Sequence, residues 1–141
     1  MAAPKPLIAT IAFFIITMAL AYPWHMMLFH DIYQSMGAFT RTEPIIPLGM
    51  LAVLTQGAVI AYLYPFYYQP GERPLLQGIK FSLLVGAVVY SVMGFSVAAK
   101  IDINPIGSFL LYSFIFQCLQ FVATGASLGL IYGDIKTEPA S

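Results

Sequence analysis

Charged residues are scarce in this chain: they make up 9% of its 141 residues, while 60% are hydrophobic. An average soluble domain carries roughly 25% charged residues. A soluble fold of this composition would expose large apolar patches, which monomers avoid. The sequence therefore predicts an integral membrane protein with the lipid bilayer as its first partner. The net charge is zero, so the chain lacks the basic surface that nucleic acid binding requires.

Cysteine is also nearly absent, because Cys118 stands alone. A single thiol excludes an internal disulfide and Cys-x-x-Cys redox chemistry. All six acidic residues lie at span ends or in loops: Asp31, Glu43, Glu72, Asp102, Asp134 and Glu138. Proton-coupled transporters need an ionisable group within the membrane, and the small multidrug transporters rely on an acidic residue in their first helix, so proton-driven export is disfavoured.

Catalytic patterns are missing as well. The sequence shows no cluster of nucleophile, base and orienting residue of the kind that hydrolytic chemistry needs. The arginine-rich motif of membrane glutathione transferases, another four-span family of this length, is absent too. These absences lean against an enzyme.

Four long apolar stretches are what the chain does have. They cover about residues 7–29, 45–68, 75–99 and 106–133. Each reaches the roughly 20 residues needed to cross the hydrocarbon core, and Lys80, near the start of the third, can extend to the interface. The sequence predicts an all-α membrane protein: one domain over residues 1–141, with four transmembrane helices in a bundle. Residues 1–21 resemble a secretory signal, but the apolar run continues to Phe29, which favours a retained span.

Proline and basic residues add detail to this layout. Pro74 is placed to open the third helix, and Asn104 to cap the fourth with Pro105 at its first position. Four basic residues fall on one side of the spans and two on the other: Lys5, Arg73, Lys80 and Lys136 against Arg41 and Lys100. Cytoplasmic loops carry the excess of Lys and Arg, so both termini are expected in the cytoplasm.

Glycines recur at intervals of four or eight in the last two spans. They are Gly86, Gly94, Gly125, Gly129 and Gly133. Small residues let helices approach closely in lipid, where hydrophobicity gives little association. The stripes favour packing among the four helices of one chain, with self-association or docking on a partner protein as the alternative.

The stretch YPWHMMLFHDIY (residues 22–33) allows a metal site. His25, Met26, His30 and Asp31 supply ligands of the kind that copper sites use. The two histidines are five residues apart, about 140° around a helix, so they cannot easily hold one ion together. A haem held by two histidines would need a second chain.

An interfacial helical extension after the first span explains the same stretch better. Leu28, Phe29, Ile32, Tyr33 and Met36 recur at helical spacing, with polar residues opposite. Pro23 is expected to kink the helix, and Gly37 to end it. We therefore predict no cofactor, with copper or haem as the alternative.

Polar residues inside the spans are few. Gln56 lies in the second span, and Gln117 and Gln120 lie in the fourth. A buried amide must find a partner. Interhelical hydrogen bonds are the simpler interpretation; a cavity for a small molecule, lined by these amides and Tyr90, is the alternative.

The layout also resembles a known group. The stretch WHMMLFHDIYQSMGAFTRTEPIIPLGMLAVLTQGAVIAYLYP, a glycine-bearing third span and the ending GASLGLIYG are similar to small bacterial four-span proteins classified as a domain of unknown function. The resemblance implies a bacterial inner-membrane protein and transfers no catalytic residue.

Three functions are left open. The first, which we predict, is a structural or accessory protein that docks on a larger complex or on itself through the glycine faces; the other two are alternatives. The second is a small-molecule or lipid-binding protein, or a facilitator, with a polar cavity. The third is a metal or haem protein that uses residues 25–31.

Overall fold

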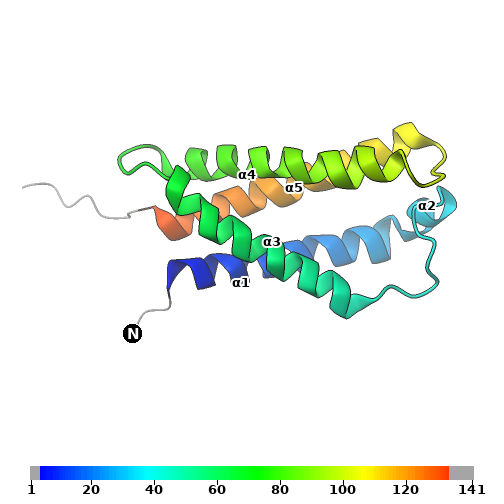
Figure 1. The fold of residues 1–141 in the computed structure, drawn as a ribbon, viewed down its shortest axis with the longest axis horizontal. Helices are drawn as coiled ribbons and strands as arrows, with labels where there is room; N and C mark the ends of the chain where they lie inside the picture. Colours follow the sequence, from blue (N-terminus) through cyan, green and yellow to red (C-terminus); the bar gives the residue numbers. More distant parts are fainter. Residues whose placement is uncertain (1–3, 134–141) are drawn as a thin grey trace, which may run out of the picture.

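The computed structural model describes residues 4–133 and shows four long helices and one short one (Figure 1). The helices are α1 (Lys5–Tyr22), α2 (His30–Ser35), α3 (Ile46–Tyr67), α4 (Pro74–Tyr90) and α5 (Ile106–Tyr132). Two π-helical segments extend α1 and α4: η1 (Pro23–Leu28) and η2 (Ser91–Ser96). The described residues contain no strand, and the prediction of an all-α four-helix bundle is confirmed.

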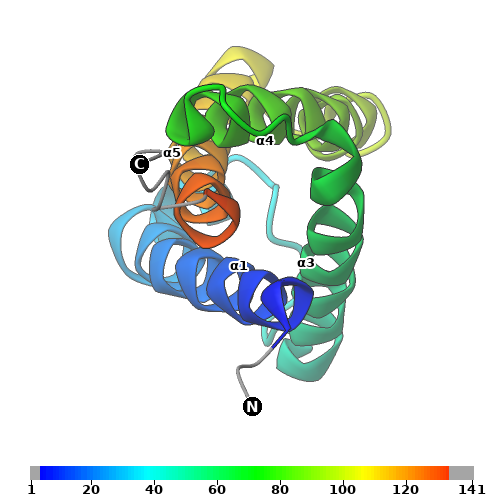
Figure 2. The same ribbon diagram turned by 90° about the vertical axis from the view of Figure 1, so that its left-hand side faces the viewer.

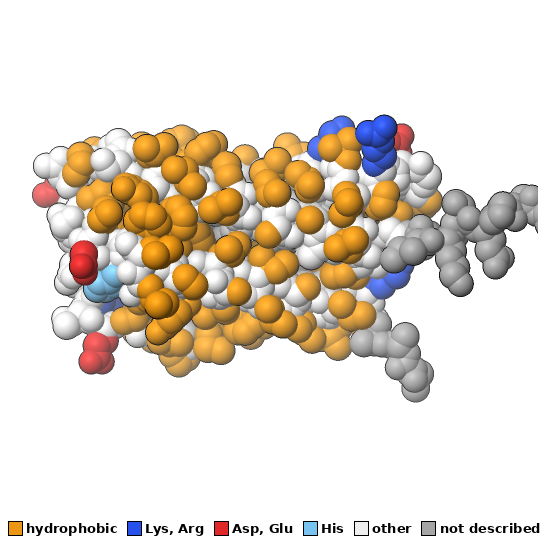
Figure 3. All heavy atoms as spheres, turned by 180° about the vertical axis from the view of Figure 1, so that it is seen from behind, with side chains coloured by type: hydrophobic (Ala, Val, Ile, Leu, Met, Phe, Trp, Pro, Cys, Tyr) orange, Lys and Arg blue, Asp and Glu red, His pale blue; other side chains and the backbone are white. Residues whose placement is uncertain are grey.

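The outer surface suits a bilayer. All four long helices of the described chain are long and apolar enough to cross a membrane. Large apolar side chains such as Leu84, Leu111 and Leu130 point outward, each about 60% exposed. Apolar side chains cover the length of the molecule, while charged ones gather at its two ends (Figure 3). Of the residues used above to count charge, Asp134, Lys136 and Glu138 lie outside the described residues.

Helices α4 and α5 make the closest contact in the bundle, and glycines allow it. A Cβ atom on Gly125 would lie 2.6 Å from the carbonyl oxygen of Gly78, and one on Gly129 would lie 2.6 Å from that of Pro74. Gly86 receives the ring of Phe121. These glycines are therefore covered within one chain.

The other two glycines of the predicted stripes behave differently. Gly133 follows the end of α5 and lies against the side chain of Pro74. Gly94 lies in η2 and faces the ring of Tyr90, one turn earlier in the same helix. Gly94 thus makes room for an aromatic ring and brings no second helix close.

Helix α3 crosses the bundle obliquely. It meets α4 at the end where a short turn joins the two helices, and there Tyr64 and Tyr67 contact Phe81 at centroid distances of 5.2 and 5.4 Å. It then passes along α1, where Gly57 packs against Phe13. Towards its start α3 moves away from α4, as Figures 1 and 2 both show.

The turn between α3 and α4 is closed by one side chain. The Gln77 amide nitrogen donates to the carbonyl of Gln69, and the backbone N–H of Gln69 donates to Gln77 Oε1, both at 2.8 Å. Pro74 is the first residue of α4, as expected. This end of the bundle, which carries Lys5, Arg73 and Lys80, is called the basic end below.

The segment after α1 differs from the predicted continuous helix. The π-helical segment η1 begins at Pro23, and the Phe29 N–H bonds to the Trp24 carbonyl, five residues back, at 3.0 Å. Phe29 then leaves helical geometry (φ −122°, ψ 12°), so α2 is a separate helix. The expected apolar face is divided: Tyr33 is buried, whereas Leu28 is 68% exposed. Because the chain breaks at Phe29, one helical period does not run through both parts.

Two further expectations concern chain reversals. Gly37 has φ = 79° and ends the α2 region, as predicted. The expected cap of the last helix is wrong by one residue: α5 begins at Ile106, and Pro105 is extended (ψ 131°). Asn104 does not cap the helix with its side chain; its backbone N–H donates to the Met36 carbonyl at 3.0 Å. That bond ties the loop before α5 to the end of α2.

Candidate functional site

A partly open cavity of about 400 Å³ lies between the helices, towards the α2 end. Its lining includes all four residues expected to form a cavity: Gln56 from α3, Tyr90 from α4, and Gln117 and Gln120 from α5. We call it the amide cavity. The cavity lies between the two hydrophobic clusters of the bundle. One lining residue, Val89, packs against the cluster at the basic end, and other lining residues belong to the cluster around α2.

The polar groups of the amide cavity fall into two kinds. Gln120 donates to Thr17 Oγ1 on α1 at 2.9 Å, and the Tyr90 hydroxyl donates to the Leu110 carbonyl at 2.9 Å. The side-chain amides of Gln56 and Gln117 make no hydrogen bond within residues 4–133. Gln117 is only 9% exposed. The amide atoms of Gln56 and Gln117 are not fully buried, so a molecule in the cavity can reach them, and the cavity contains unused hydrogen-bonding capacity.

His25 also lines the amide cavity. Its ring lies among aromatic rings, with centroid distances of 4.6 Å to Phe116, 5.0 Å to Tyr33 and 6.1 Å to Phe39. Its Nδ1 atom is buried and has no hydrogen-bond partner in the described part of the chain. Geometry thus assigns His25 to the cavity wall.

Trp24 lies directly behind this wall. Its indole N–H donates to the Tyr33 hydroxyl at 3.3 Å, and its ring lies 5.9 Å from that of Phe116. Burial raises the pKa of Tyr33, an effect larger than the lowering by its hydrogen bonds with Trp24 and Ser113. Tyr33 is therefore a neutral phenol at physiological pH. The cavity wall includes Tyr33, Phe116 and Ser113. Trp24 contacts the first two of these, so a single side chain separates the only tryptophan of the chain from a molecule in the cavity.

Both π-helical segments border the amide cavity. His25 and Met26 come from η1, and Met93 comes from η2. Such segments are rare and are found frequently at functional sites, where they change the direction of side chains within a helix. Pro23 accounts for the first, because a proline cannot donate the hydrogen bond of an α-helix.

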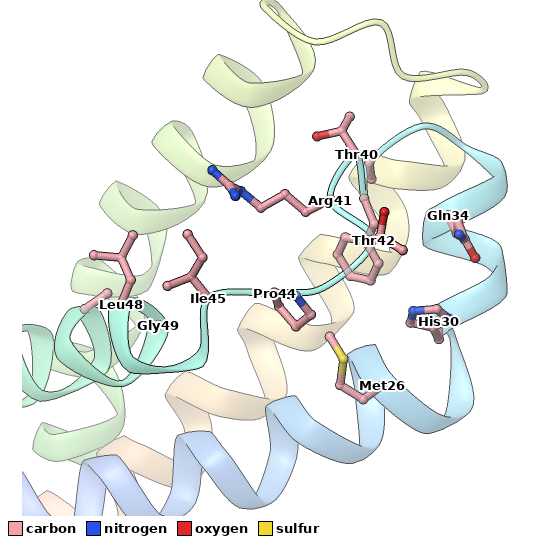
Figure 4. Close-up of a pocket in the computed structure, with 13 residues that line it drawn as sticks. Met26, His30, Gln34, Thr40, Arg41, Thr42, Pro44, Ile45, Leu48 and Gly49 are labelled. Carbon is pink, nitrogen blue, oxygen red and sulfur yellow. The ribbon is translucent and has the colours of Figure 1, made fainter.

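A second, larger hollow adjoins the first. It has a volume of about 500 Å³ and is formed by the segment that joins α2 to α3, so we call it the loop pocket. It shares Met26, Ala38 and Phe39 with the amide cavity. Figure 4 shows the Met26 thioether and the His30 ring on one side of it, and Ile45 and Leu48 on the other. Both hollows are partly open, but the two unpaired amides, Gln56 and Gln117, line only the amide cavity.

The candidate metal ligands do not come together as a set. His30 Nδ1 lies 3.3 Å from Asp31 Oδ1 at the surface. His25 lies among aromatic rings of the amide cavity. Within residues 4–133 no three His, Cys, Asp or Glu side chains are close enough to hold one ion. Met26 lines both hollows, together with His25 in the amide cavity and with His30 in the loop pocket.

Several residues of the cavity wall could not be predicted from the sequence. Ser113 and Phe116 carry no signal in a membrane helix. Phe39 arrives from a loop whose path the sequence does not reveal. His25 was considered only as a metal ligand, and its position in the wall belongs to the π-helical segment η1, which the sequence did not predict. Comparison with known protein families, curated proteins and solved structures finds no match to this chain.

Proposed function

We propose that this protein binds a lipid-soluble small molecule with uncharged polar groups in the amide cavity. One observation carries the proposal: Gln117 is a nine-tenths buried amide that faces a 400 Å³ cavity and has no protein partner in the described chain. Pockets of this size, largely apolar with a few convergent polar groups, are typical of small-molecule sites.

An accessory or self-associating role is supported less well. That interpretation rested on the glycine faces, and Gly86, Gly125 and Gly129 lie against their own chain. The short loops and the absence of intramembrane acids fit either role. The cavity favours binding.

The proposed setting is a bacterial inner membrane with the basic end in the cytoplasm. Lys5, Arg73 and Lys80 lie at that end, and Arg41 and Lys100 lie at the other. The rule that cytoplasmic loops are richer in Lys and Arg supports this orientation. The amide cavity then lies in the outer half of the bilayer.

Native mass spectrometry tests the proposed function. Protein purified in mild detergent from the cells that naturally express it should carry a non-covalent small molecule at close to one per chain. Ser113→Phe fills the cavity and should remove this adduct. Leu111→Phe changes a lipid-facing residue two positions away and should keep it. A wild-type protein with no adduct, or one that Ser113→Phe retains, would overturn the proposal.

A further inference from the structure

The charge of the occupant follows from the lining of the amide cavity. No Asp, Glu, Lys or Arg of residues 4–133 lines it. A charged group buried there would lack a counter-charge, and burying an unpaired charge is far more costly than burying a neutral polar group. The part of the ligand inside the cavity is therefore uncharged.

The number of polar groups on the occupant follows from the two unpaired amides. Gln56 lies about half-way along α3 and Gln117 about half-way along α5. They come from different helices and face the same cavity. A ligand with one hydroxyl would satisfy one amide and leave the other unpaired. Two separated polar groups on one ligand can satisfy both.

The shape of the occupant follows from the aromatic wall. The rings of His25, Tyr33, Phe39 and Phe116 lie within about 4.6–6.1 Å of one another in the pairs measured. Such rings pack well against a flat ring. Met93, on η2, lines the cavity and is also 56% exposed. An apolar tail can therefore pass beside Met93 into lipid.

Resting on the proposed function, we propose that the occupant is a quinone-type molecule: a flat, uncharged ring with two carbonyl groups and an apolar tail. The amide N–H groups of Gln56 and Gln117 donate to the two carbonyl oxygens, and the tail extends towards lipid. Because an amide also accepts hydrogen bonds, the same two residues can pair with the hydroxyl groups of the reduced ring. The site thus accommodates both forms.

Fluorescence of Trp24 provides the test, because it is the only tryptophan and lies behind the cavity wall. The probe is 2-decyl-1,4-benzoquinone, titrated into the purified full chain in detergent micelles. A bound quinone ring quenches a nearby indole, so we expect saturable quenching. Decylbenzene has the same tail without carbonyl groups and should neither quench saturably nor compete. N-Acetyltryptophanamide in the same micelles corrects for quenching without a binding site.

Amide variants make the test specific. Gln117→Leu and Gln56→Leu should each raise the apparent Kd about fivefold to tenfold, the value of one hydrogen bond. Gln69→Leu changes a glutamine in the α3–α4 turn, outside the cavity, and should leave the Kd unchanged. Circular dichroism confirms that each variant is folded before titration.

Two results would overturn the quinone proposal: no saturable quenching, or saturable quenching that neither cavity variant weakens. The mass-spectrometric adduct separates the outcomes. If Ser113→Phe removes an adduct but the quinone does not bind, the proposed function stands and the ligand class is wrong. If neither an adduct nor quinone binding is seen, both proposals fail.

Discussion

Gln117 and Gln120 lie nearly one turn apart on α5 and are both buried, yet they should respond oppositely to the same substitution. Gln120 bonds to Thr17 on α1. Gln117 faces the cavity without a partner in the described chain. Replacing each with Leu removes an amide and keeps a side chain of similar size. The difference between the two variants therefore reports whether the amide was satisfied by protein.

Gln120→Leu should lower the free energy of unfolding by about 1–2 kcal/mol. It removes an interhelical hydrogen bond, worth roughly 0.6–1.7 kcal/mol in membranes, and leaves the buried Thr17 hydroxyl unpaired. Gln117→Leu should change stability by between zero and a gain of about 1 kcal/mol, because a poorly satisfied amide is removed. The gain is limited because the cavity of about 400 Å³ has room for waters, each of which takes roughly 30 Å³.

Unfolding of ligand-free protein in mixed dodecyl maltoside and sodium dodecyl sulfate micelles measures both values. Thr17→Val completes a double-mutant cycle. The coupling energy should be clearly different from zero for Thr17 with Gln120 and close to zero for Thr17 with Gln117. A loss for Gln117→Leu equal to that for Gln120→Leu would mean that Gln117 is bonded within the protein, which contradicts its proposed contact with a ligand.

Three further predictions test other parts of the structure. Gly125→Leu places a side chain against the backbone of α4 and should lower the free energy of unfolding by about 3 kcal/mol or more. This loss should not depend on protein concentration. The control Gly49→Leu places its side chain in open space and should lower the free energy of unfolding by less than about 0.5 kcal/mol. Gln77→Leu removes both hydrogen bonds of the α3–α4 turn and should lower the free energy of unfolding by about 1–3 kcal/mol. In those bonds Gln69 uses only its backbone groups, so Gln69→Leu should leave the free energy of unfolding unchanged in the same assay. Because burial raises the pKa of Tyr33, its phenol ionises at lower pH in the unfolded chain than in the folded one. The free energy of unfolding should therefore fall as the pH rises above about 10. Tyr33→Phe should reduce this dependence on pH, and an unchanged dependence would contradict the burial of the Tyr33 phenol.

The helices could be predicted from the sequence because the bilayer imposes a simple rule. An uninterrupted apolar run of sufficient length has only one satisfactory backbone structure in lipid. Polar residues inside such runs are also visible by position, which is why Gln56, Gln117 and Gln120 were identified together with Tyr90. Their meeting on one cavity depends on the oblique path of α3, and no local pattern encodes a crossing angle between lipid-facing helices.

Backbone irregularities were the harder part to predict. Pro23 signals an interruption, but the same proline is compatible with a kink, a break or a π-helical segment. The second π-helical segment, SVMGFS, contains no proline at all. Spacing by four placed Gly94 on a helix-packing stripe, whereas in the structure it receives the ring of Tyr90. Regular spacing fails where the helix itself changes its number of residues per turn.

Those two π-helical segments also constrain how the gene can change. A π-helical turn accommodates one residue more than an α-helical turn, so deleting a single residue within 23–28 or 91–96 would let the helix return to regular geometry. The side chains on the two flanks would keep their relative orientation, and those within the segment would change direction. Hydrophobicity, length and membrane insertion would be unchanged, yet His25 or Met93 would face a different direction. A descendant with such a deletion would keep the four spans and lose the cavity wall.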